Sequence, residues 1–276
     1  MDHPEALASI TSDADLERRF GGLRRLYGDA GYARIRAAHV VVVGVGGVGS
    51  WAVEALARSG VAELTLIDLD QVSESNINRQ VQALGATLGQ AKTEALRARI
   101  ADINPACKVT AIEEFVDASN WPGLLSTYQG VPPPAPVSAV IDACDQVRAK
   151  AVIAAWAIAS KTPLVSVGAA GGKQRAHAVE VADLADTTHD PLLASLRQRL
   201  RQHHAGARKG AMGVQCVFSR EAVTAPVGTG AVDANLNCHG YGSSISVTAT
   251  FGMVAAGEVL AALVLEGSQT PPQSWI

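Results

Sequence analysis

The sequence predicts an α/β protein built on a Rossmann-like, doubly wound, mostly parallel sheet, with a C-terminal antiparallel and helical elaboration. Three observations support this class. Short apolar, β-branched runs alternate with helical segments between residues 39 and 167. A glycine-rich turn joins the first run to the first helix, and after Gly168 the alternation stops. Strands that alternate with helices favour a parallel sheet covered by crossover helices.

The first strand and helix carry the clearest pattern. The run His39-Val-Val-Val-Val43 is short, uninterrupted and β-branched, which is typical of a strand buried on both faces of a parallel sheet. It follows an amphipathic segment over residues 16–38. A helix over residues 50–59 and a strand over residues 63–67 complete a β-α-β unit of the expected length.

Further elements follow in the same order. In the core we expect a helix over residues 89–103, strands over 108–112, 137–141 and 163–167, and a helix over 146–160. After it we expect an antiparallel strand over 178–181, a basic helix over 190–204, a strand over 214–218 and a long apolar helix from residue 243. No repeat is visible, which predicts one domain over 1–276: a helical segment (1–38), a core (39–167) and an elaboration (168–276).

Composition narrows the classes of function. The 276 residues are 48% hydrophobic and 18% charged, and 23 Lys and Arg against 26 Asp and Glu give a net charge of −3. This balance argues against nucleic-acid binding through the whole surface. The cysteines, Cys107, Cys144, Cys216 and Cys238, form no C-x-x-C pair, so neither a zinc ribbon nor a disulfide scaffold is expected. An acidic N-terminus without an apolar stretch predicts a cytoplasmic protein.

One apolar segment is nearly long enough to cross a bilayer. Residues 245–265 are rich in Ala, Val and Leu but contain Glu258. A carboxylate near the bilayer centre costs about 2–3 kcal/mol. We therefore expect a helix packed inside the protein or at a subunit contact, and no membrane association.

The glycine turn predicts a nucleotide site. Gly44, Gly46 and Gly49 form G-x-G-x-x-G between a strand and a helix, where the backbone can approach a diphosphate and the helix N-terminus supplies partial positive charge. Asp68, at the end of the second strand, is placed to accept hydrogen bonds from a ribose. These residues alone distinguish neither NAD from ATP nor binding from catalysis.

Two cations after this unit favour ATP. Arg79 and Lys92, with the amide of Asn76, follow the second strand, and a triphosphate carries about two more negative charges than the pyrophosphate of a dinucleotide. Asp145 closes I-D-A-C-D at the end of the fourth predicted strand, where a carboxylate can hold magnesium between phosphates or cap the next helix. An NAD-dependent oxidoreductase would leave both cations without a role.

Several short sequences point to one known family. Residues 19–167 contain G-V-G-G-V-G-S, L-I-D-L-D, S-E-S-N-I-N-R-Q, G-Q-A-K, I-N-P and I-D-A-C-D. Together they resemble the ThiF/MoeB/HesA family of ATP-dependent adenylating enzymes, relatives of ubiquitin-activating enzymes. R-F-G-G-L-R-R-L-Y-G, D-P-L-L-A-S-L-R-Q-R-L, C-V-F-S and T-A-T-F-G elsewhere resemble the tRNA threonylcarbamoyladenosine dehydratase branch of that family.

The resemblance implies a role for each site residue. Phosphate approach is implied for Gly44, Gly46 and Gly49, ribose binding for Asp68, phosphate binding for Asn76, Arg79 and Lys92, and magnesium binding for Asp145. It also implies a homodimer and a sulfur-transfer partner protein. The arginine that reaches the neighbouring subunit's ATP in sulfur-carrier-activating members aligns with Gly22, leaving Arg19 or Arg25 as substitutes. Their C-x-x-C zinc site is missing, so no structural zinc is expected.

The implied reaction is adenylation of a carboxylate on tRNA. ATP would activate the threonyl carboxylate of threonylcarbamoyladenosine, and the ureido nitrogen would then close a ring, because an intramolecular attack needs no enzyme thiol. Cys238, in a glycine-rich loop, and His239 are alternative reactive groups. Residues 196–210 carry five cations and no acid, which predicts a phosphate-binding surface for tRNA. These cations are Arg197, Arg199, Arg201, Arg208 and Lys209.

Three other functions remain open from the sequence. An adenylyltransferase for the C-terminus of a sulfur-carrier or ubiquitin-like protein would respond to a small β-grasp protein and not to tRNA. An NAD-dependent oxidoreductase would bind a nicotinamide. A scaffold would bind nucleotide without turnover, although the joint presence of Arg79, Lys92 and Asp145 argues against it.

Overall fold

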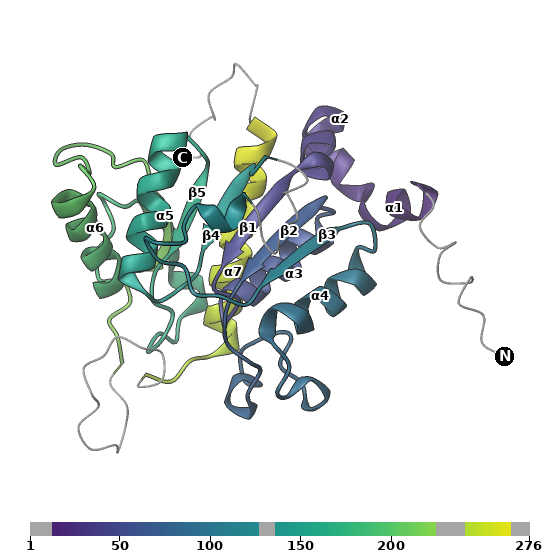
Figure 1. The fold of residues 1–276 in the computed structure, drawn as a ribbon, viewed down its shortest axis with the longest axis horizontal. Helices are drawn as coiled ribbons and strands as arrows, with labels where there is room; N and C mark the ends of the chain where they lie inside the picture. The colour runs from purple at the N-terminus through teal and green to yellow at the C-terminus, as the bar shows by residue number, and fades with distance from the viewer. Residues whose placement is uncertain (1–12, 127–135, 225–240, 266–276) are drawn as a thin grey trace.

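The computed structural model describes residues 13–126, 136–224 and 241–265 and contains one seven-stranded sheet (Figure 1). The strand order is β3-β2-β1-β4-β5-β7-β6, and all neighbours are parallel except the pair β6 and β7. The strands are β1 (His39–Val43), β2 (Glu63–Ile67), β3 (Lys108–Ile112), β4 (Ala139–Asp142), β5 (Leu164–Val167), β6 (Val179–Asp183) and β7 (Gln215–Ser219). The predicted doubly wound, mostly parallel sheet is confirmed.

The central strand β1 is buried along its whole length, as its uninterrupted valine run predicts. It pairs in parallel with β2, where Val43 lies opposite Ile67, and with β4, where Val43 lies opposite Asp142. Because successive side chains point to opposite faces, Val40 and Val42 enter one core layer while Val41 and Val43 enter the other. Helices must therefore cover both faces of the sheet.

Two layers of helices provide that cover. One face packs against α2, α3, α4 and α7, and the other against α5, α6 and the segment around Trp121. The α-helices are α1 (Asp13–Phe20), α2 (Gly22–Ala37), α3 (Gly49–Arg58), α4 (Lys92–Ile103), α5 (Val147–Ser160), α6 (Pro191–His203) and α7 (Ile245–Leu265). Short 3-10 turns are η2 (Glu74–Asn76), η3 (Gly85–Thr87), η4 (Gly123–Leu125) and η5 (Ala176–Ala178).

The apolar helix α7 is long and apolar enough to span a bilayer, yet half of its most apolar stretch is buried inside the protein. It packs along α3, where a side chain at Gly252 would overlap the carbonyl oxygen of Val48. Its one acidic residue, Glu258, accepts a 2.6 Å hydrogen bond from Gln215 of β7. The predicted internal packing of this helix is therefore confirmed.

Two details differ from the sequence prediction, and one strand takes a place in the sheet that the sequence did not predict. The N-terminal helical segment is two helices with a further kink at Gly28 (φ 71°), where the positive φ favours glycine. The helix predicted from residue 89 begins only at Lys92, because Gly89 (φ 80°) stands in a turn and Gln71 pairs with Ala91 in an isolated bridge. β7, the last strand along the chain, inserts between β5 and β6.

Candidate nucleotide-binding site

A cleft opens at the carboxyl ends of β1, β2 and β4, where the strand order reverses on the two sides of β1. It encloses about 1190 Å³ of empty space, including the part open to solvent. The glycine turn 44–49, the end of β2, the start of α4 and the loops after β3, β4 and β5 all contribute to its wall. In doubly wound sheets this switch point is where ligands bind, so the fold itself places the site.

The glycine turn fits closely against the neighbouring loop. Gly44 has φ 79°, and a side chain there would come within 2.8 Å of the Cys144 backbone nitrogen. A side chain at Gly49 would overlap the Gly44 carbonyl oxygen. At Gly46 the nearest atom is the Gln80 amide nitrogen, 3.8 Å away, so this position faces open space in the cleft. Two glycines thus shape the turn, and the third leaves room for a ligand.

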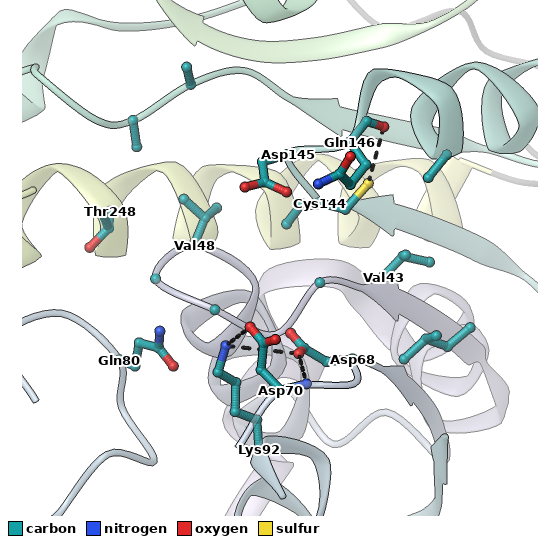
Figure 2. A pocket seen from close by; sticks show the side chains of 18 of the residues that line it. Val43, Val48, Asp68, Asp70, Gln80, Lys92, Cys144, Asp145, Gln146 and Thr248 are labelled. Carbon is teal, nitrogen blue, oxygen red and sulfur yellow. Dashed lines mark hydrogen bonds and ion pairs between the residues drawn. The ribbon is translucent and has the colours of Figure 1, made fainter. Parts of the chain in front are cut away.

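Asp68, Asp70 and Lys92 form a charged group on one side of the cleft (Figure 2). Asp68 accepts hydrogen bonds from the backbone nitrogens of Val45 (2.8 Å) and Asp70 (2.9 Å). The Lys92 ammonium lies 2.6 Å from Asp70 Oδ2 and 3.8 Å from Asp68 Oδ1. Burial raises the pKa of Asp68, and the nearby Lys92 charge opposes that rise. The structure therefore brings the predicted ribose and phosphate residues together.

Arg79 lies along the glycine turn. Its Cδ atom is 3.3 Å from where a side chain at Gly47 would begin, and both residues line the cleft. The guanidinium donates to the Ser75 carbonyl oxygen (2.7 Å) and to Asn78 Oδ1 (2.8 Å). No carboxylate among the described residues pairs with it, so its charge is available to an anionic ligand.

The predicted phosphate amide at Asn76 has a different environment. Asn76 is buried, lies outside the cleft lining, and its Oδ1 accepts a hydrogen bond from the Ser73 backbone nitrogen. Its side chain therefore caps the short turn η2. Gln80, which the sequence reasoning did not single out, lines the cleft instead, and its position directly after Arg79 was the only available signal.

Asp145 lies on the opposite wall from Lys92 (Figure 2). It is exposed, and Gln146 occupies the N-cap position of the following helix without a capping side-chain hydrogen bond, so the helix-capping alternative is not what the structure contains. Within the described ranges, no three His, Cys, Asp or Glu side chains gather as metal ligands. Magnesium commonly binds through one or two carboxylates plus substrate phosphates, and a single free carboxylate at the cleft fits that pattern.

A buried ion pair beneath the cleft was missed by the sequence reasoning. Lys150 and Asp142 are both fully buried, 3.1 Å apart, and Lys150 also donates to Ser166 Oγ and the Val167 carbonyl oxygen. Burial opposes the Lys150 charge, but Asp142 outweighs it and raises the pKa of this lysine. The pair joins the carboxyl ends of β4 and β5. Nothing in the sequence indicated this pair, because Lys150 lies in the mostly apolar helix α5.

The described cysteines are poor nucleophiles. Burial raises the pKa of Cys107 to about 12, and it also raises the pKa of Cys144 and of Cys216. Only Cys144 lines the cleft. Cys238 and His239 lie outside the described residues.

The predicted basic surface on α6 divides into two groups. Arg197 is half-buried, and its Nη1 donates to the carbonyl oxygens of Leu184 and Thr187, so it stabilises the turn before the helix. Arg201 donates to the Ala207 carbonyl oxygen. The remaining three cations make no side-chain hydrogen bond or ion pair within the described part of the chain: the half-exposed Arg199 and the exposed Arg208 and Lys209.

The two arginines considered for a neighbouring site also differ. Arg19 donates to the carbonyl oxygens of Asp102 and Ile103, at the end of α4 in the same chain. Arg25 is exposed on α2.

A glycine turn and two cations at the switch point of this sheet define a Rossmann-like nucleotide-binding protein. The chain belongs to the ThiF family, whose model matches residues 19–274. It is 42% identical over 275 residues to the tRNA threonylcarbamoyladenosine dehydratase of Escherichia coli, a match that covers 95% of this chain and 99% of that one.

Solved structures agree with this similarity. The E. coli tRNA N6-threonylcarbamoyladenosine dehydratase in complex with ATP matches with a TM-score of 0.81 and 43% identity, covering 94% of this chain and 99% of that chain. The same enzyme in complex with AMP gives a TM-score of 0.82. By contrast, the molybdopterin-synthase adenylyltransferase of Salmonella typhimurium is 37% identical over only 49% of this chain and 51% of its own length.

Proposed function

We propose that this protein is an ATP-dependent tRNA threonylcarbamoyladenosine dehydratase. The observation that carries the proposal is similarity over nearly the full length of both chains to an enzyme of that name, which has been solved with ATP and with AMP. An adenylyltransferase acting on a sulfur carrier is less well supported, because that similarity covers only half of each chain.

The reaction begins at the α-phosphorus of ATP. A carboxylate oxygen of the threonyl group attacks it, the bond to the bridging oxygen breaks, and pyrophosphate leaves with the electron pair. The product is an acyl-adenylate, in which a poor leaving group has become a good one. Negative charge grows on the leaving oxygens, so cations fixed beside the phosphates lower the barrier.

Two cations of this chain are suited to that task. Lys92 extends from the start of α4 and Arg79 lies beside Gly47, so the triphosphate would pass between them along the glycine turn. Gly46 faces the open cleft and lets phosphate oxygens approach the backbone. Asp68, already held by two backbone nitrogens, has a carboxylate positioned to accept from the ribose hydroxyls.

Asp145 is the residue we assign to magnesium. A bound magnesium ion would neutralise charge on the phosphates. Asp145 stands across the cleft from Lys92, and the carboxylates Asp68 and Asp70 already face that ammonium. Asp145 and Lys92 would therefore lie on opposite sides of the space proposed for the triphosphate.

The second half of the reaction needs little from the protein. The ureido nitrogen of the same side chain attacks the acyl carbon, AMP leaves, and a ring closes with the net loss of one water. Because nucleophile and electrophile belong to one substituent, their effective concentration is very high. No thiol is required, which agrees with the raised pKa of Cys144 in the cleft.

The proposal also includes a surface for tRNA, an oligomeric state and a partner protein. Arg199, Arg208 and Lys209 on and after α6 would contact tRNA phosphates, with Leu192 of the same helix lining the cleft. The family resemblance further supports a homodimer acting in the cytoplasm, with a sulfur-transfer protein as partner.

Mass analysis of anticodon-loop nucleosides tests this function. Purified protein is incubated with ATP, magnesium and tRNA that carries threonylcarbamoyladenosine. We expect a nucleoside lighter by one water, formed only when ATP is present, together with AMP and pyrophosphate. An unchanged nucleoside would contradict the proposal, and pyrophosphate exchange stimulated by a β-grasp protein would support the sulfur-carrier alternative instead.

A further inference from the structure

We propose that Trp51 is a positioning residue that holds Arg79 in place against the glycine turn. The inference rests on the proposed function, because it assumes that Arg79 acts on the phosphates of ATP. Trp51 belongs to the first turn of α3, directly after the glycine turn. Its indole Nε1 donates a 2.9 Å hydrogen bond to the Arg79 carbonyl oxygen, 28 residues further along the chain.

The need for such a contact follows from how Arg79 is otherwise held. Its guanidinium donates to Ser75 and Asn78, which belong to the same short segment of chain. These bonds fix the shape of the segment, but they do not fix where the segment lies relative to the phosphates. Contacts to other parts of the fold set that position, and one of them is the 3.2 Å hydrogen bond that Asn78 Nδ2 donates to the Ser243 carbonyl oxygen.

Trp51 supplies such a contact at Arg79 itself. Nearby, Ser50 Oγ accepts from the Val81 backbone nitrogen at 3.4 Å, and Gln82 donates to the Val45 carbonyl oxygen at 3.0 Å. Both of these ties hold the chain two or three residues beyond Arg79. The indole bond is therefore the tie closest to the cation, and it comes from the helix whose N-terminus faces the phosphate space.

The backbone that carries Trp51 packs against α7. At Gly252 of α7, an added side chain would lie 2.9 Å from Trp51 Cβ and would overlap the Val48 carbonyl oxygen. α7 thus fixes the start of α3, and the Trp51 indole links that helix to the main chain of Arg79.

A double-mutant cycle tests the proposal in the full-length protein. Trp51→Phe keeps an aromatic ring and removes the N–H donor. One hydrogen bond corresponds to about a three- to tenfold change. We expect kcat/KM for ATP and the calorimetric affinity for ATP to fall by about that factor. In the Arg79→Ala background the same substitution should cause no further loss, because the residue it positions is gone.

Two results would overturn the proposal: normal activity in Trp51→Phe, or an equal loss with and without Arg79. A failure of the proposed function looks different, since Arg79→Ala would then leave ATP turnover unchanged. Trp121→Phe is the matched control. Trp121 is buried against Trp156 in the other core layer, and its indole nitrogen has no hydrogen-bond partner to lose.

A measurement on the unsubstituted side chain covers the case in which Trp51→Phe does not fold. The indole N–H resonance of Trp51 is assigned by replacing the other tryptophans. It should be protected from solvent exchange and should shift when ATP is added. A freely exchanging resonance that ignores ATP would refute the proposal.

Discussion

Lys92 owes its position to two carboxylates, and this explains how a lysine can be almost completely buried at the edge of the cleft. It is 6% exposed, and its ammonium faces Asp70 at 2.6 Å and Asp68 at 3.8 Å. The side chain is thereby aimed across the cleft instead of into solvent. An ammonium already held in place loses little further entropy when phosphate binds.

Replacing Lys92 by Ala should lower the rate of adenylation by more than tenfold without unfolding the protein. The substitution removes charge beside the leaving phosphates, and it leaves the nearer partner carboxylate, Asp70, exposed to solvent and not buried without a counter-charge. AMP release with saturating tRNA measures the rate of adenylation, and a thermal melt measures the stability of the variant. Arg97→Ala is the control, because Arg97 is exposed on the same helix, pairs with Glu94 and does not line the cleft. Full activity in Lys92→Ala would rule out its role.

For single residues, the sequence predicted which charged side chains lie near the cleft better than it predicted what each side chain contacts. Asp68, Arg79 and Lys92 line the cleft beside the glycine turn, as their charges and positions in the sequence predict. Asn76 and Arg197 looked equally suitable, but their side chains are occupied by backbone groups close by, at Ser73 and at Leu184 and Thr187. Such local hydrogen bonds depend on turn geometry, which the sequence does not specify.

Among the elements, α3 and α4 are joined by one buried carboxylate. Glu54 of α3 accepts from Arg58 (2.7 Å) and from Arg99 of α4 (2.6 and 3.0 Å). Burial alone would raise the pKa of Glu54, but the hydrogen bonds from Arg99 and Arg58 outweigh it, and the pKa is lowered. Glu54 thereby holds together α3, which follows the glycine turn, and α4, which begins at Lys92.

Glu54→Gln should cost about 2 kcal/mol of stability at neutral pH, because hydrogen bonds to a charged group are lost. A lowered folded-state pKa means that this contribution is present above the unfolded pKa and disappears as the pH falls through the folded one. Urea unfolding at pH 7 and again below the folded pKa measures both. A deficit that does not shrink in acid would show that the charge is not responsible.

The α6 surface makes a separate prediction about tRNA. Changing Arg199, Arg208 and Lys209 together to Glu should weaken tRNA binding by more than tenfold at low salt and make its salt dependence shallower by about 2 in slope. Affinity for ATP should be unaffected. Arg197 is left intact because it supports the fold.

The matched control for this surface changes Arg97 and Lys161 to Glu, because both are exposed on parts of the surface outside α6. Binding measured across a salt series separates the two sets of variants. Equal tRNA affinity in the α6 triple variant and the control would remove this surface from the proposal.

Helices and strands with a clear hydrophobic period could be predicted from the sequence. The order of the strands in the sheet could be predicted only in part. The strands over residues 39–43, 63–67 and 108–112 have the bounds that their apolar runs indicate. β7 could not be placed from sequence, because β6 leaves an open position beside β5, and the later strand β7 fills it by pairing with both. The late start of α4 depends on a pairing between Gln71 and Ala91, which are far apart in any local pattern.

Across the whole molecule, the cleft and the surface proposed for tRNA lie at different positions along the sheet. The glycine turn and Lys92 lie near the centre of the strand order, while α6 and its cations lie at the side opposite α1 (Figure 1). α6 meets the cleft only at its first turn, through Leu192. A nucleotide buried in the cleft and an RNA lying along α6 would therefore meet at this point, where the threonyl carboxylate must reach the α-phosphorus.

The most direct measurement follows the carboxylate oxygens. Threonylcarbamoyladenosine in tRNA is prepared with ¹⁸O in the threonyl carboxylate and incubated with the protein, ATP and magnesium. Attack on the α-phosphorus followed by ring closure must leave one labelled oxygen in AMP and none in pyrophosphate. Label in inorganic phosphate or pyrophosphate, or AMP free of label while the ring closes, would contradict adenylation in this cleft.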